Sequence, residues 1–160
     1  MNTFKYLKLG LLLKLIERED FISYINLDYN NLDYKDFFTE ILSYGDNIDY
    51  NSLYQILDKY NKEEIENNFY DIHTFFMCCI KLKFKDWEVA QKKLIIYYDF
   101  FKEELNLIEF EFWSRLKDDL SLREGGFSGC MSLPKELNDY FRKFDYNCEN
   151  INFIKFILYP

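Results

Sequence analysis

Apolar residues recur three and four positions apart through most of this chain, and very little interrupts that spacing. Only two prolines are present, one of them at the last position, and the five glycines gather mainly between residues 125 and 129. Proline and glycine are the residues that most often end helices and mark linkers. Their scarcity predicts an all-α fold, and the lack of a linker predicts one compact domain over residues 1–160.

Each expected helix is defined by apolar side chains that share one of its faces. The expected helices cover residues 3–19, 34–44, 50–60, 62–83, 86–105 and 107–121, and a further one follows the glycine-containing loop. In that last helix Pro134 occupies a position that suits a first helical turn. The pattern therefore predicts six to eight helices. The last ten residues also permit a short strand at the C-terminus, because they are rich in β-branched and aromatic side chains.

A short repeat of Asn, an apolar residue, Asp and Tyr ends at Tyr29, Tyr34 and Tyr50. In the last two copies the acid, Asp33 or Asp49, directly precedes an expected helix. An Asp at that position accepts hydrogen bonds from the free amides of the first turn, and the helix dipole favours its charge. The apolar residue before each Asp is placed to pack against the helix it precedes. We therefore interpret the repeat chiefly as helix capping.

The sequence contains no recognisable catalytic or metal-binding motif. His73 is the only histidine, and a lone His among apolar residues of a helix is more often a core residue than a base or a ligand. The segment 125–130 has neither the spacing of a nucleophile elbow nor that of a phosphate loop, and it is expected to be a flexible loop between helices. Carboxylates such as Asp118 and Asp119 are expected on solvated faces. We expect no enzyme, no cofactor and no metal.

The net charge limits the classes of partner, and the cysteines indicate the cellular compartment. The net charge of −8 disfavours binding to nucleic acid or to an anionic membrane surface. No run of about 18 apolar residues is present to span a membrane, and the start lacks a signal-peptide cleavage pattern. None of the four cysteines has the CxxC spacing of a zinc or redox motif. We expect a cytoplasmic protein whose adjacent Cys78 and Cys79 are small, buried and reduced, and whose folding needs no disulfide.

The negative charge is concentrated in one stretch of the chain. Residues 17–73 contain 14 acids and four bases, and tyrosines alternate with acids between residues 20 and 50. Tyrosine offers a large contact area with a polar tip, and acids accelerate encounter with a basic partner. Five residues are candidates for contact with a basic protein: Asp28, Tyr29, Asp36, Asp46 and Tyr50. The alternative is that these tyrosines are half-buried at the edge of the core and that the acids only maintain solubility.

A set of scattered, mostly aromatic and apolar residues gives this chain a resemblance to known families. They are Lys85-Asp86-Trp87, Leu94, Tyr97-Tyr98-Asp99-Phe100, Phe144-Asp145-Tyr146, Phe153-Ile154 and Tyr159-Pro160. With these residues the chain resembles a family of small bacterial domains of unknown function. Its small, acidic and helical character is also similar to that of immunity proteins from bacterial polymorphic-toxin systems. This resemblance implies an immunity-type inhibitor of a toxin. The alternatives are a regulatory or structural interaction protein, such as one derived from a phage, and then an enzyme.

Overall fold

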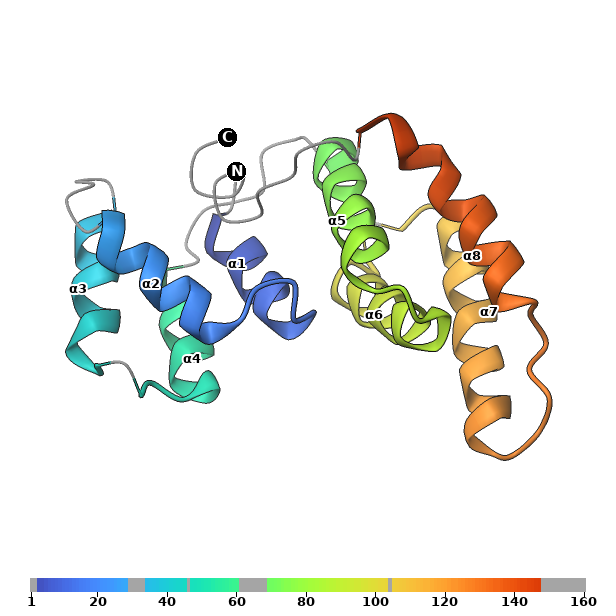
Figure 1. The fold of residues 1–160 in the computed structure, drawn as a ribbon, viewed down its shortest axis with the longest axis horizontal. Coiled ribbons are helices and arrows are strands. Elements are labelled where there is room, and N and C mark those ends of the chain that lie inside the picture. The colour runs from blue at the N-terminus through green and yellow to red at the C-terminus, as the bar shows by residue number, and fades with distance from the viewer. Residues whose placement is uncertain (1–2, 29–33, 46, 61–68, 104, 148–160) are drawn as a thin grey trace. The chain divides into compact units, whose positions relative to one another are not determined.

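A computed structural model describes residues 3–28, 34–45, 47–60, 69–103 and 105–147. Over these residues the chain forms eight α-helices and a short 3-10 helix, η2, and it forms no strand there (Figure 1). The prediction of an all-α fold with six to eight helices is confirmed. The final segment, where a short strand was permitted, lies outside the described residues.

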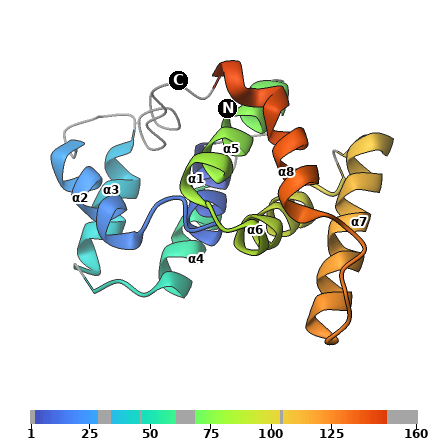
Figure 2. The same cartoon turned by 45° about the vertical axis from the view of Figure 1, so that its right-hand side comes forward.

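The chain divides into two compact units near residue 68. Unit 1 comprises the described residues between 3 and 60, and unit 2 comprises those between 69 and 147. Figure 2 shows the helices of both units from a second direction. The expectation of a single domain over residues 1–160 stays a prediction, and each unit is described by itself.

Unit 1 contains α1 (Thr3–Leu12), α2 (Arg18–Asp28), α3 (Lys35–Ser43) and α4 (Tyr50–Tyr60). Helix α4 packs against both α1 and α3. The core is aromatic: the ring centroid of Phe37 lies 4.6 Å from that of Phe4 and 5.5 Å from that of Tyr60. The buried face of α4, with Leu53, Ile56 and Leu57, is the one that the apolar spacing predicts.

The single helix expected over residues 3–19 is wrong. Helix α1 ends at Leu12, Lys14 has a positive φ of 55°, and α2 begins at Arg18. The apolar spacing continues through this turn because Leu13 and Ile16 are buried there as well. Because no proline or glycine marks the break, the sequence pattern predicted one helix and missed α2.

Unit 2 contains α5 (Phe69–Lys83), α6 (Trp87–Phe100), α7 (Leu107–Glu124), α8 (Leu133–Phe141) and η2 (Arg142–Asn147). Helix α6 packs against α5, α7 and α8, and η2 packs against α5 and α8. These packed faces bury Phe76, Leu94, Tyr97, Leu116 and Leu137. Pro134 lies in the first turn of α8, as the sequence predicted.

Side-chain caps fix the starts of several helices. The carboxylate of Asp49 accepts hydrogen bonds from the amides of Asn51 and Ser52, at 2.9 and 3.0 Å, and from the Ser52 hydroxyl. The capping expected of Asp49 is therefore confirmed, whereas Asp33 lies outside the described residues. Two further caps were not predicted: Asp86 accepts from two amides at the start of α6, and Asn106 accepts from the Glu109 amide at the start of α7.

Asp119 is not on a solvated face, contrary to expectation: its side chain is fully buried. One carboxylate oxygen accepts the Met131 amide at 2.7 Å, and the other accepts Gln91 Nε2 at 2.9 Å and Arg123 Nε at 2.8 Å. Arg123 in turn donates to the Met131 carbonyl. A Cβ on Gly129 would lie 2.6 Å from Arg123 Nε and closer still to Asp119. The loop expected to be flexible is thus held at its end by a buried ionic network.

The cysteines differ from expectation at one position. Cys78 and Cys79 are both buried, as predicted, but Cys78 is disulfide-bonded. Of the other described cysteines, Cys79 and Cys130 are free. The sequence could not reveal this disulfide because the number and spacing of cysteines do not fix which of them pair. Disulfides are rare in the cytoplasm, and the cytoplasmic location stays a prediction.

Candidate functional site

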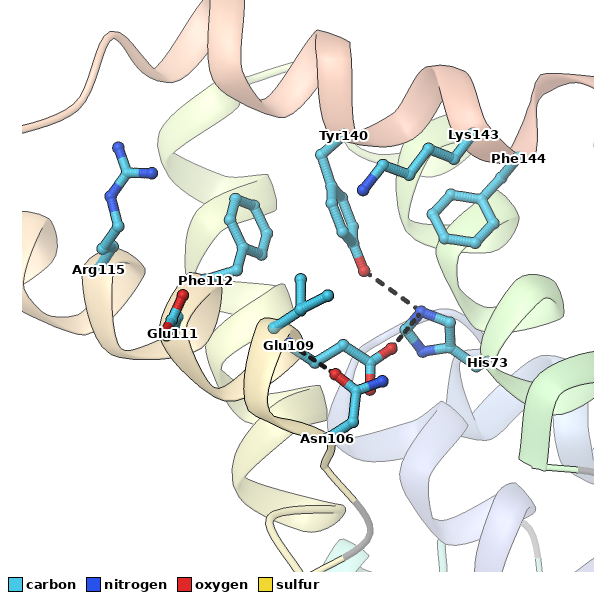
Figure 3. A pocket seen from close by; sticks show the side chains of 10 residues that line it. His73, Asn106, Glu109, Glu111, Phe112, Arg115, Tyr140, Lys143 and Phe144 are labelled. Atoms are coloured by element: carbon cyan, nitrogen blue, oxygen red, sulfur yellow. Dashed lines mark hydrogen bonds and ion pairs between the residues drawn. The ribbon is translucent and has the colours of Figure 1, made fainter.

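Unit 2 contains a half-open pocket of about 510 Å³, which Figure 3 shows from close by. Helix α5 supplies His73, the start of α7 supplies most of the polar groups, and the end of α8 with η2 supplies the opposite wall. The lining residues are His73, Asn106, Ile108, Glu109, Glu111, Phe112, Arg115, Tyr140, Lys143 and Phe144. A pocket of this size suits a small molecule.

The start of α7 sets the position of the acidic side chains. Because Asn106 caps the helix, Glu109 occupies its third position, where the helix dipole favours a carboxylate. Phe112 follows Glu109 by three residues, so the two side chains share a face of α7. Both lie on the same wall of the pocket in Figure 3.

His73 lies at the base of the pocket and is 5% exposed. Its Nδ1 is 3.0 Å from the Tyr97 hydroxyl, and its Nε2 is 3.3 Å from the Tyr140 hydroxyl and 3.4 Å from Glu109 Oε1. A carboxylate only accepts, so a neutral ring with its proton on Nε2 donates toward Glu109. Nδ1 is then left to accept from the Tyr97 hydroxyl. The expectation that this histidine is buried among satisfied partners agrees with this arrangement.

Burial lowers the pKa of His73 to about 4, with a smaller contribution from the positive charge of Lys143. The ring is therefore neutral near pH 7, and its 3.4 Å approach to Glu109 is a contact with a neutral group rather than an ion pair. Burial also raises the pKa of Cys79 to about 12, so this thiol is a poor nucleophile at neutral pH.

Aromatic rings form most of the remaining wall. Phe112 stacks on Tyr140 with centroids 4.4 Å apart and an interplanar angle of 19°. Phe144 meets His73 and Tyr140 edge-on, at 5.4 and 5.6 Å. The Tyr140 hydroxyl contacts that of Tyr98, and burial raises the pKa of both tyrosines. The site thus combines an apolar aromatic wall with a base of neutral hydrogen-bonding groups.

The two cations of the pocket already have partners within unit 2. Arg115 reaches α8, where its Nη2 lies 2.6 Å from Glu136 Oε2. The Lys143 ammonium stands 5.3 Å from the centroid of the Tyr140 ring. The two carboxylates differ from them: over the described residues, neither Glu109 nor Glu111 forms an ion pair with a lysine or arginine.

The residues predicted to bind a partner all belong to unit 1 and are only partly described. Tyr29 and Asp46 lie outside the described residues, and Asp28 is the last residue of α2, with a side chain that is not described. Asp36 is exposed in the first turn of α3. Tyr50 is 36% exposed at the start of α4. This partial exposure fits the alternative of a half-buried tyrosine as well as a contact residue, so the partner-binding role of Tyr50 stays a prediction.

The structure brings Tyr50 together with Glu17, an acid that the sequence did not single out. Its hydroxyl is 3.5 Å from Glu17 Oε2, and Arg18 donates to the carbonyl of Ile48 at 3.1 Å, so the starts of α2 and α4 lie side by side. Four residues, Glu17, Glu19, Asp49 and Tyr50, form what we call the acidic tyrosine surface.

Sequence reasoning missed every polar pocket residue except His73. A signal was present in part, because Asn106 followed three positions later by Glu109 resembles a capping box that precedes a helix. Nothing in the sequence places Tyr140 or Lys143 beside His73. Across the described residues no group of three or more metal-ligating side chains converges. The helices that are described there are also too short or too polar to cross a membrane.

Comparison of the chain with protein-family models, with curated proteins and with solved structures found no match. The resemblance to a bacterial family of unknown function and to immunity proteins therefore stays a prediction.

Proposed function

We propose that this chain is a protein-binding module that engages a basic protein partner through the acidic tyrosine surface of unit 1. The specific form of the proposal is an immunity-type inhibitor of a bacterial toxin. One observation carries it: an exposed Tyr50 is grouped with Glu17, Glu19 and Asp49 at the adjoining starts of two helices. A partly exposed aromatic ring close to acids supplies both contact area and attraction to a basic surface.

The acids of this surface are held in their charged form. Hydrogen bonds from backbone and from Arg18 lower the pKa of Glu19, and hydrogen bonds from Ser52 lower that of Asp49. Both groups therefore keep their negative charge into mildly acidic solution. A stable field of one sign increases the rate at which an oppositely charged protein arrives. The tyrosine ring, which loses water on contact, is expected to set how slowly the partner leaves.

The alternative is a regulatory or structural interaction protein, for which the same surface would serve a partner that is not a toxin. The identity of the partner separates the two. A basic toxin encoded beside this chain supports the immunity proposal. A basic partner without toxicity supports the alternative.

The experiment expresses the chain together with the protein encoded by the neighbouring gene and measures complex formation by size-exclusion chromatography. We expect a complex that Tyr50→Ala weakens, with the variant still folded by circular dichroism. The matched control is Asp118→Lys, which changes an exposed charge in unit 2 and should leave the complex intact. An acidic partner, or a complex that tolerates Tyr50→Ala together with Glu19→Lys, would overturn the proposal.

A further inference from the structure

The charges that line the pocket of unit 2 are unevenly satisfied. Both cations are engaged within unit 2, Arg115 by Glu136 and Lys143 by the ring of Tyr140. Glu109 forms no ion pair with a lysine or arginine of the described residues: its side chain is only 19% exposed, and in the pocket it contacts the neutral ring of His73. A carboxylate that is largely withdrawn from water is costly unless a positive charge or several donors satisfy it. The pocket therefore presents an acceptor that a bound cation would complete.

The rings around Glu109 suit the same kind of ligand. Phe112, Tyr140 and Phe144 form the apolar wall, and the faces of aromatic rings attract cations. The structure itself contains an example, since the Lys143 ammonium already stands over Tyr140. At the open side, Ile108 is 74% exposed and offers an apolar surface to the body of a ligand.

From these features we infer that the pocket is a binding site for a small organic cation, a protonated amine on an apolar or aromatic body. The ammonium group pairs with Glu109, and the body lies against Phe112, Phe144 and Ile108. The volume of about 510 Å³ accommodates a molecule of this class with room for water. This site is separate from the proposed protein-binding function, which rests on unit 1 alone.

Lys143 has a defined part in this inference. Its ammonium lies at the wall of the pocket and repels a second cation that approaches Glu109. Removing its charge should therefore strengthen binding of an amine, whereas removing the charge of Glu109 should weaken it. A site for an anion requires the opposite result for both substitutions.

The test uses three probes of nearly equal shape and different charge: phenethylamine, 3-phenylpropionate and 2-phenylethanol. Because His73 is the only histidine and lies at the base of the pocket, its ring signals in a ¹H–¹³C spectrum report on this site alone. We expect phenethylamine to shift these signals in a saturable way. The neutral alcohol should bind at least about tenfold more weakly, the discrimination expected from one well-formed charge contact. The anion should not bind.

Variants of the full-length chain test the assigned roles. Glu109→Gln should reduce the affinity for phenethylamine by about tenfold and leave that for 2-phenylethanol unchanged. Lys143→Met should increase the affinity for the amine. Asp118→Asn, on the same helix but outside the pocket lining, is the control of equal charge change and should have no effect.

Three results would overturn the inference: equal binding of the amine and the alcohol, preferential binding of the anion, or no saturable shift with any probe. Even where Glu109→Gln does not fold, the affinities of the wild-type chain for the three probes still test the inference. In that event Lys143→Met still tests the sign of the charge preference. The Lys143 side chain is exposed, so its replacement should not disturb the fold.

Discussion

Acidification should destabilise this protein through its single histidine well before its carboxylates are protonated. In the folded chain burial holds the pKa of His73 at about 4, against an ordinary value of 6.5. The charged groups around the ring act in opposite directions, because Lys143 lowers its pKa and the nearby Glu109 carboxylate favours the protonated form. The uncharged hydroxyls of Tyr97 and Tyr140 also contact the ring.

The direction of the pH dependence follows from which state, folded or unfolded, binds the proton. Below pH 6.5 the unfolded chain takes up a proton on this histidine that the folded chain does not, so the stability falls as the pH falls from 6.5 toward 4. A difference between 6.5 and about 4 corresponds to a loss of about 2 kcal/mol between pH 7.5 and pH 5. Carboxylates with lowered pKa values, such as Asp49 and Asp119, act chiefly below that range.

Two assays examine this prediction. Titration of the lone histidine signal by NMR gives its pKa directly, and urea unfolding of the wild type and of His73→Gln between pH 7.5 and pH 5 gives the loss of stability. The variant should lack the loss of about 2 kcal/mol. A measured pKa of 6.5 or above would refute the reasoning. It would mean that the Glu109 carboxylate outweighs burial and that the two side chains form an ion pair.

Three further outcomes are expected. Asp49→Ala should destabilise the protein by about 0.5–2 kcal/mol in urea unfolding through loss of the α4 cap. Asp118 is an exposed acid within α7, so Asp118→Ala should be nearly neutral, and equal effects of the two substitutions would argue against capping. Asp119→Ala should cost about 3 kcal/mol because it leaves Gln91, Arg123 and the Met131 amide without their acceptor, and a neutral result would contradict the buried network. Peptide mapping of the non-reduced protein should find Cys78 in a disulfide and Cys79 as a free thiol, and reduction should lower the Tm; finding Cys78 as a free thiol would contradict the structure.

The helices of this fold were predictable where amphipathic spacing and a local cap agree. Helix α4 shows both, since Asp49 caps it and its apolar residues fall on one buried face. Prediction failed at residues 13–17, where buried side chains in a turn continue the helical spacing and no glycine or proline marks the break. Local pattern cannot separate a turn with buried residues from another turn of helix.

The candidate site was less predictable because its residues are brought together by packing between helices. His73 and Tyr140 are 67 positions apart and meet only when α8 packs against α5. Asp119 shows the same limit: its neighbour Asp118 is exposed, and only tertiary structure reveals that Asp119 points toward Gln91 and Met131. In unit 1 the sequence predicted an acidic, tyrosine-containing stretch, but the pairing of Tyr50 with Glu17 depends on how α2 lies beside α4.

Association kinetics at two salt concentrations test the proposed function most directly, with the neighbouring gene's product as the partner. Glu19→Lys and Asp36→Lys should slow association and weaken its dependence on salt, because both reverse exposed negative charges of unit 1. Tyr50→Ala should instead speed dissociation, and Asp118→Lys should change neither rate. Rates that are indifferent to salt and to both reversals would contradict binding of a basic partner through the acidic tyrosine surface.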